Sequence, residues 1–119
     1  MAIGRALKSL REDDILILGS GYTFHNMQAF FNPANETYQA SKQFNNWLEQ
    51  VIVDDADLSR LRDWEKAPGA RLCHPREEHL LPLFVTAGAM DAKTERAQLI
   101  YDTRSTPNDH AVTGYLFSS

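Results

Sequence analysis

The strongest pattern of apolar and polar positions lies in the middle of the chain, between residues 36 and 52. Its large apolar side chains are Phe44, Trp47, Leu48, Val51 and Ile52, which follow the spacing i, i+3, i+4, i+7 and i+8. This spacing places all five side chains on one face of an α-helix. The pattern therefore predicts a long amphipathic helix.

Three shorter stretches also carry helical signals. Residues 2–11 place apolar side chains at helical spacing, and residues 58–66 do so after the acidic run 54–57, whose side chains can cap a helix start. A third helix is expected from Pro75, because proline suits the first helical position and two glutamates follow in the first turn. Pro82 is expected to kink this helix.

Three apolar runs predict strands. Residues 15–18 follow acidic residues and precede Gly-Ser-Gly, which is typical of a buried strand that ends in a tight turn. Residues 97–101 and 111–117 are also rich in strand-forming side chains, and the loop 106–109 would join them as neighbours. Together with the helices, these strands predict an α/β fold with a mixed sheet flanked by helices. No repeat or linker divides the chain, so residues 1–119 are expected to form a single domain.

Composition and charge narrow the classes of function. The formal net charge is −4 and the 12 lysines and arginines are scattered along the chain, which argues against nucleic acid as a partner. No apolar run approaches the length of a membrane span, and the first residues do not resemble a signal peptide. The single cysteine, Cys73, cannot form an internal disulfide. We therefore expect a soluble cytoplasmic protein.

Four histidines are the candidate chemical groups. His25 follows the glycine turn, His74 and His79 flank the expected helix start, and His110 lies in the last loop. For each of them, a surface position or a hydrogen-bonded place in the core is the ordinary alternative. His74 and His79 do not form a zinc pair of the HxxxH kind, because side chains five positions apart on a helix point about 140° away from each other.

The glycine turn itself allows a nucleotide site as an alternative. The stretch GSGYTF lacks the third glycine of the dinucleotide-binding pattern, and Phe24 occupies its place. A bulky ring there would obstruct the close packing of helix and strand that the glycine permits. The sequence therefore gives little support to a dinucleotide site.

Three motifs in the chain resemble one known family. ILILGSGYTFHNM, FNNWLEQ and LCHPREEHLLPLFVTAGA, in this order and at this separation, resemble the C-terminal half of the LigB-like class III extradiol dioxygenases, of the DODA type. The resemblance covers nearly the whole chain. It implies the C-terminal half of the LigB-like fold, and an enzyme that opens a catecholic aromatic ring with O2 at a non-haem metal.

The resemblance also implies roles for individual residues. In the family, the histidine of GSGxxxHN is the active-site acid/base that assists catechol deprotonation, and His25 stands at that position. The histidine of the EEHxxP run occupies the position of a metal ligand, which is His79 here, with Fe(II) as the expected metal and zinc as a substitute. His74 and Asn26 are expected to line the substrate site. Their alternatives are a loop-capping histidine and a turn asparagine.

The chain also departs from the family pattern. Full-length members are longer, and their other metal-binding histidines lie in an N-terminal half. One or two histidines hold a metal too weakly to maintain an open facial site. We therefore expect a separate N-terminal half, or a homo-oligomer, to supply the missing ligands.

Two other hypotheses remain open from the sequence. The chain could be a non-catalytic oligomerising or binding module derived from the same fold, with an apolar surface that includes the aromatic-rich segment 24–31. Alternatively, His25, His74 and His79 could bind a structural zinc, across a dimer.

Overall fold

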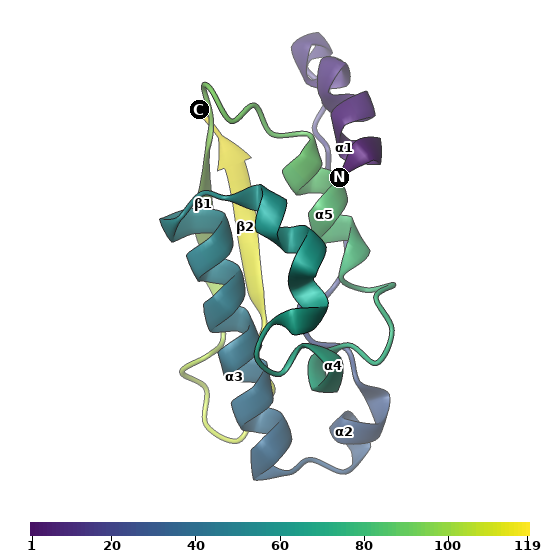
Figure 1. Ribbon diagram of the computed structural model, residues 1–119, viewed down its shortest axis with the longest axis vertical. Coiled ribbons are helices and arrows are strands. Elements are labelled where there is room, and N and C mark those ends of the chain that lie inside the picture. The colour runs from purple at the N-terminus through teal and green to yellow at the C-terminus, as the bar shows by residue number, and fades with distance from the viewer.

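The computed structural model describes residues 1–119, in an elongated shape of 45 × 24 × 24 Å. Its α-helices are α1 (Ala2–Leu7), α2 (Met27–Phe31), α3 (Asn35–Glu49), α4 (Ala70–Cys73) and α5 (Leu81–Gly88). Its other helical segments are η1 (Lys8–Asp13), η2 (Gln50–Asp54) and η3 (Leu58–Lys66). Its strands are β1 (Arg96–Asp102) and β2 (Thr113–Ser118). Figure 1 shows α3 running alongside the two strands, with α1 and α5 at one end of the molecule and α2 at the other. No helix is long and apolar enough to cross a membrane.

The long amphipathic helix predicted between residues 36 and 52 is confirmed. It consists of α3 and the π-helical turn η2 that continues it. Phe44, Leu48, Val51 and Ile52 are almost completely buried, and Trp47 packs against the same cluster. The periodic apolar face therefore forms the centre of the hydrophobic core, as its spacing predicted.

A buried polar network fixes α3 against β2. The side-chain amide of Asn45 donates to the carbonyl of Ser41 at 2.9 Å and to that of Ala111 at 2.8 Å. Its carbonyl accepts from the hydroxyl of Thr113 at 2.6 Å. The Ser41 hydroxyl in turn accepts from the backbone N–H of Ala111 at 2.8 Å. Because each buried polar group has a partner, the network holds the hairpin in register on the helix.

The α/β composition is confirmed, but the sheet is simpler than predicted. The strands β1 and β2 pair as an antiparallel hairpin, with an irregularity between Leu99 and Tyr101. Residues 15–18 do not form a strand, so no mixed sheet is present. The expected burial of this run is also wrong, since Leu16 is 80% exposed and Leu18 is 82% exposed. The run lacks a neighbouring strand within this chain.

The N-terminal helix packs closely against α5. The helix predicted for residues 2–11 is divided into α1 and the 3-10 helix η1. A Cβ atom on Gly4 would clash with the backbone of Val85, and one on Gly88 would clash with the backbone of Met1. The two glycines therefore allow the backbones of α1 and α5 to approach each other directly.

The helix predicted from Pro75 is wrong. Residues 75–80 form turns, in which the N–H groups of Leu80 and Leu81 both donate to the carbonyl of Glu77. The helix α5 begins only at Leu81, and Pro82 lies in its first turn instead of kinking it. Pro82 fits this position because proline has no N–H to donate, and the N–H groups of the first helical turn have no partner within the helix. His79 consequently lies in the turn before α5.

Candidate functional site

Two histidines that lie 54 positions apart in the sequence are stacked against each other. The ring centroids of His25 and His79 are 3.4 Å apart, with 15° between the ring planes. His25 is half-buried and His79 is exposed. The convergence of these two imidazoles, which the sequence predicted, is therefore present, although His79 is held by a turn and not by a helix.

Two backbone hydrogen bonds bring the pair together. The N–H of His25 donates to the carbonyl of Cys73 at 2.8 Å, and the N–H of Tyr22 donates to the carbonyl of His79 at 2.9 Å. These bonds join the segment after the glycines to the last residue of α4 and to the turn before α5. The backbone positions of both histidines are thus set by main-chain contacts, which do not depend on surface side chains.

The glycines of GSG serve close packing and not a tight turn. Their φ angles are not positive, and the segment passes through them without a turn. A Cβ atom on Gly21 would clash with the carbonyl oxygen of His79, and one on Gly19 would lie 2.8 Å from the carbonyl oxygen of Pro82. The tight turn predicted here is therefore wrong. The glycines allow the backbone to lie directly on the turn that carries His79.

Asn26 supports the segment that carries His25. Its side-chain carbonyl accepts from the N–H of Ala29 at 3.1 Å, which caps the start of α2. Its amide group donates to the carbonyl of Leu72 at 2.8 Å. Both the carbonyl and the amide group of this side chain therefore have partners within the protein. This is the structural role of a turn asparagine, which the sequence left open as the alternative to a lining residue.

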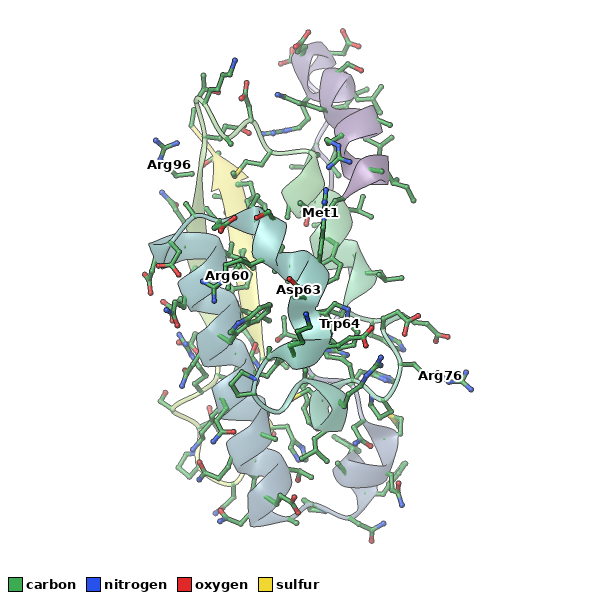
Figure 2. All side chains as sticks on the ribbon, in the orientation of Figure 1. Met1, Arg60, Asp63, Trp64, Arg76 and Arg96 are labelled. Carbon is green, nitrogen blue, oxygen red and sulfur yellow. The ribbon has the colours of Figure 1, made fainter.

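A shallow hollow of about 210 Å³ opens beside the two imidazoles. It is lined by His25, Asn26, Met27, Pro75, Arg76, Glu78 and His79. Figure 2 shows Arg76 extending outward from the loop between α4 and α5. The sequence reasoning did not select Arg76 or Glu78, although both belong to the HPREEH run that carries His79.

His74 is not part of the exposed pair. Its ring is completely buried, with edge-on contacts to Phe44 at 5.6 Å and Trp64 at 6.1 Å between centroids. Neither ring nitrogen has a hydrogen-bond partner. Burial lowers the pKa of His74 to about 4, and the nearby backbone of Thr23 opposes this shift without reaching hydrogen-bond geometry. His74 is therefore a neutral core imidazole that a ligand in the hollow does not reach in this conformation.

His110 also has a place in the packing of the fold. Its ring stacks on Phe24 with a centroid distance of 4.2 Å, and its Nε2 atom lies 2.9 Å from the hydroxyl of Thr37. Burial lowers the pKa of His110, and Asp109 partly opposes this effect. The ring links the last loop to the start of α3.

The stacked pair does not have the arrangement of two ligands on one metal ion. Imidazole nitrogens bound at about 2.0–2.1 Å to one ion lie about 3–3.4 Å apart, and their rings diverge outward from the ion. The rings of His25 and His79 are instead nearly parallel, with 3.4 Å between their centroids and 15° between their planes, so at most one of them binds a given ion in this conformation. No group of three His, Cys, Asp or Glu side chains that could hold a metal is present. The three histidines considered for a structural zinc are not brought together within this chain, because His74 is turned into the core.

The sequence of this chain is similar to known aromatic ring-opening dioxygenases. Residues 1–114 match the family model described as the catalytic LigB subunit of aromatic ring-opening dioxygenase. The dioxygenase tasH of Hapsidospora irregularis is 39% identical over 75% of this chain and 31% of its own length. The 4,5-DOPA dioxygenase extradiol of Portulaca grandiflora is 34% identical over 95% of this chain and 40% of its own length.

The fold has a solved counterpart. The crystal structure of an uncharacterized Escherichia coli K12 protein aligns with a TM-score of 0.71 at 24% identity, over 95% of this chain and 47% of that protein. The chain thus spans less than half the length of these proteins. The matched family model and the relatives show that the chain belongs to the LigB family of aromatic ring-opening dioxygenases.

Proposed function

We propose that this chain forms the C-terminal catalytic portion of an extradiol dioxygenase, which opens a catecholic aromatic ring with O2 at a non-haem metal. The observation that carries the proposal is the stacked pair of His25 and His79, which are the histidines of the two motifs typical of the family. The names of the relatives, which are dioxygenases, support the same class of reaction.

In this proposal His79 is a metal ligand. It is exposed beside the hollow, and its carbonyl is tied to Tyr22, so its backbone position is fixed without using the ring. Fe(II) is the metal we propose, with zinc as a substitute in the purified protein. When bound, Fe(II) would supply the Lewis-acid and redox chemistry that allows a catecholate and dioxygen to react.

His25 is the proposed acid/base. Ring opening breaks the bond between a hydroxyl-bearing carbon and its neighbour and places both atoms of O2 in the product, and the catechol must first lose a hydroxyl proton. A ring nitrogen of His25 would accept that proton, because its imidazole lies against His79 and faces the same hollow. The backbone bond from His25 to Cys73 would fix the main chain that carries this ring.

The other predicted lining residues have supporting roles in this proposal. Asn26 lines the hollow and caps α2, so it would hold His25 and border the substrate at the same time. His74 would contact a substrate only after a rearrangement that exposes its ring. Arg76 and Glu78 line the rim with opposite charges, 3.9 Å apart, and would offer a substrate both a donor and an acceptor.

The metal requires more ligands than these two rings. We propose that the part of the family fold outside this chain, or a homo-oligomer, supplies them, since a facial site needs three protein ligands. We also place the protein in the cytoplasm, because its single cysteine, Cys73, is buried and free.

The test is oxygen uptake by the folded chain with catechol and Fe(II), with and without the co-expressed remainder of a family member. His79→Gln should abolish metal binding, as measured by the metal content of the purified complex. His25→Gln should keep the metal and lower kcat by about 10²–10⁴-fold. Phe31→Leu, an exposed change outside the hollow, is the control and should leave both unchanged. Absence of uptake in every folded preparation would refute the proposal.

A second candidate function is a non-catalytic oligomerising module. The exposed apolar side chains favour it, in particular Phe30 at 64% and Phe31 at 72% exposure. Light scattering of the purified chain tests it, and a monomer that persists at high concentration would rule it out.

A further inference from the structure

The segment 16–21 is an extended piece of backbone without any partner. None of its six residues takes part in a hydrogen bond, whether through the backbone or through a side chain. The hydrogen bonds that flank it are those of Ile15 to Leu10 and of Tyr22 to His79. The chain is therefore anchored at both ends of this segment and leaves its peptide groups free for another molecule.

The side chains of the same segment are apolar and exposed to solvent. Leu16 and Leu18 are 80% and 82% exposed, and Ile15 beside them is 46% exposed. Exposed leucines combined with unpaired peptide groups are typical of a strand whose neighbour is absent. The sequence predicts a buried strand here, and its composition suits an interior strand covered on both faces.

A large hollow of about 730 Å³ borders this segment. The residues that line it also include Ile100 of β1 and Leu116 of β2, which are 62% and 41% exposed. The polar residues that line it include Lys8, Arg11, Glu12, Asp14, Asp91 and Glu95. The exposed apolar side chains among these lining residues are suited to an apolar protein segment.

The hollow also reaches the candidate site. His79 is among its lining residues, and Gly21 at the end of the segment lies against the carbonyl of His79. The segment runs from the charged residues near Arg11 toward this histidine. A strand paired along it would therefore have one end close to the stacked imidazoles.

The length of the relatives indicates what occupies the hollow. This chain matches 31% and 40% of two curated relatives and 47% of the structural neighbour. More than half of the family fold therefore lies outside these residues, while the apolar segment and the hollow lack cover within them.

We propose that residues 16–21 accept an extended apolar strand from the part of the family fold that this chain does not cover, by backbone pairing along the hollow. The strand completes the sheet that the sequence predicts and buries Leu16 and Leu18. The inference rests on the proposed function in one respect, namely that the end of the strand near His79 is where further metal ligands enter the site.

Hydrogen exchange measured by NMR tests the pairing directly. The chain is mixed with a separately expressed polypeptide, consisting of the part of the Portulaca grandiflora relative outside the matched stretch. The amides of residues 16–21 should become protected by at least about 10-fold on mixing, because paired peptide groups exchange only when the strand opens. Complex formation with these amides unprotected, or no complex at all, would overturn the proposal.

A pair of variants distinguishes binding at this segment from nonspecific association. Leu18→Lys should weaken the complex by at least about 10-fold, since the ammonium group would have to be buried. It should leave the fold of the isolated chain unchanged, because Leu18 is exposed there. Ile3→Lys is the matched control, since Ile3 is 67% exposed and is not part of the hollow. Equal effects of the two variants would contradict the proposal.

Other outcomes are also decisive. If the chain alone protects these amides as its concentration rises, and Leu18→Lys prevents this, a second copy occupies the segment and the proposed occupant is wrong. Protection requires neither metal nor activity, so protection without metal binding would refute the proposed function and leave this inference standing. Metal binding and ring opening by the mixture, without protection of these amides, would refute this inference and leave the proposed function standing.

Discussion

Replacement of His74 with leucine removes a completely buried imidazole whose two nitrogens have no partner. The two side chains have similar volumes, so the core between Phe44 and Trp64 can repack around the change. Near neutral pH the folded imidazole is uncharged, and its loss also removes two unsatisfied polar atoms. We therefore expect the free energy of unfolding at pH 7 to stay within about 1.5 kcal/mol of the wild-type value.

The larger effect of His74 is on the response to acid. Burial lowers the pKa of His74 from 6.5 to about 4. Above pH 6.5 the imidazole is neutral in both the folded and the unfolded chain, so it adds no pH dependence. As the pH falls from 6.5 to about 4, the unfolded chain binds a proton that the folded chain excludes, so stability is lost. At 1.36 kcal/mol for each pKa unit, the loss amounts to about 3 kcal/mol.

Urea unfolding followed by far-UV circular dichroism, repeated from about pH 7 down to about pH 4, measures this slope. The difference in unfolding free energy between His74→Leu and wild type should shift by about 3 kcal/mol in favour of the variant over that range. His110→Leu is the matched control and should change the slope less, because that ring is half-buried and Asp109 favours its charged form. If the wild-type and His74→Leu curves run parallel, His74 is not a desolvated imidazole and the reasoning fails.

Three further substitutions test contacts that position the site and the core. Gly21→Ala should lower the free energy of unfolding by about 1–3 kcal/mol, because the added methyl group clashes with the carbonyl of His79. It should also shift the ring resonances of His25 and His79 in NMR spectra. Ser20→Ala should do neither, and unchanged spectra in Gly21→Ala would contradict the close approach of Gly21 to His79. Asn45→Ala should cost about 2–4 kcal/mol in urea unfolding, since it removes the donor to the carbonyl of Ala111 and leaves the hydroxyl of Thr113 with only the hydroxyl of Tyr115 as a partner. The exposed Asn46→Ala should cost about 0.5 kcal/mol or less. The hydrogen bond from Arg11 lowers the pKa of Glu95, so this carboxylate contributes stability at neutral pH that is lost as the pH falls through its folded pKa. Glu95→Gln should therefore destabilise the chain by about 1–3 kcal/mol at pH 7 and weaken the dependence of the unfolding free energy on acid pH. An unchanged dependence on acid pH would count against the ion pair.

The sequence predicted those features whose cause is local. The spacing of Phe44, Leu48, Val51 and Ile52 specifies the buried face of α3 because each of these residues meets its neighbours within one or two turns of the same helix. The β1–β2 hairpin was predictable for the same reason, since its strands adjoin in the sequence. The motifs also identified His25 and His79 as one site, and the rings do stack.

The tertiary structure decided everything that depends on distant partners. Residues 15–18 have the composition of a strand, but a strand forms only when another backbone pairs with it, and none is available within this chain. In the same way, Gly21 was predicted to make a turn, and only the fold revealed that it leaves room for the carbonyl of His79. His74 and His79 look equivalent in the run HPREEH, yet one lies in the core and the other at the surface. Which of these two histidines is buried is determined by what packs on it from elsewhere in the molecule, and the run HPREEH does not contain that information.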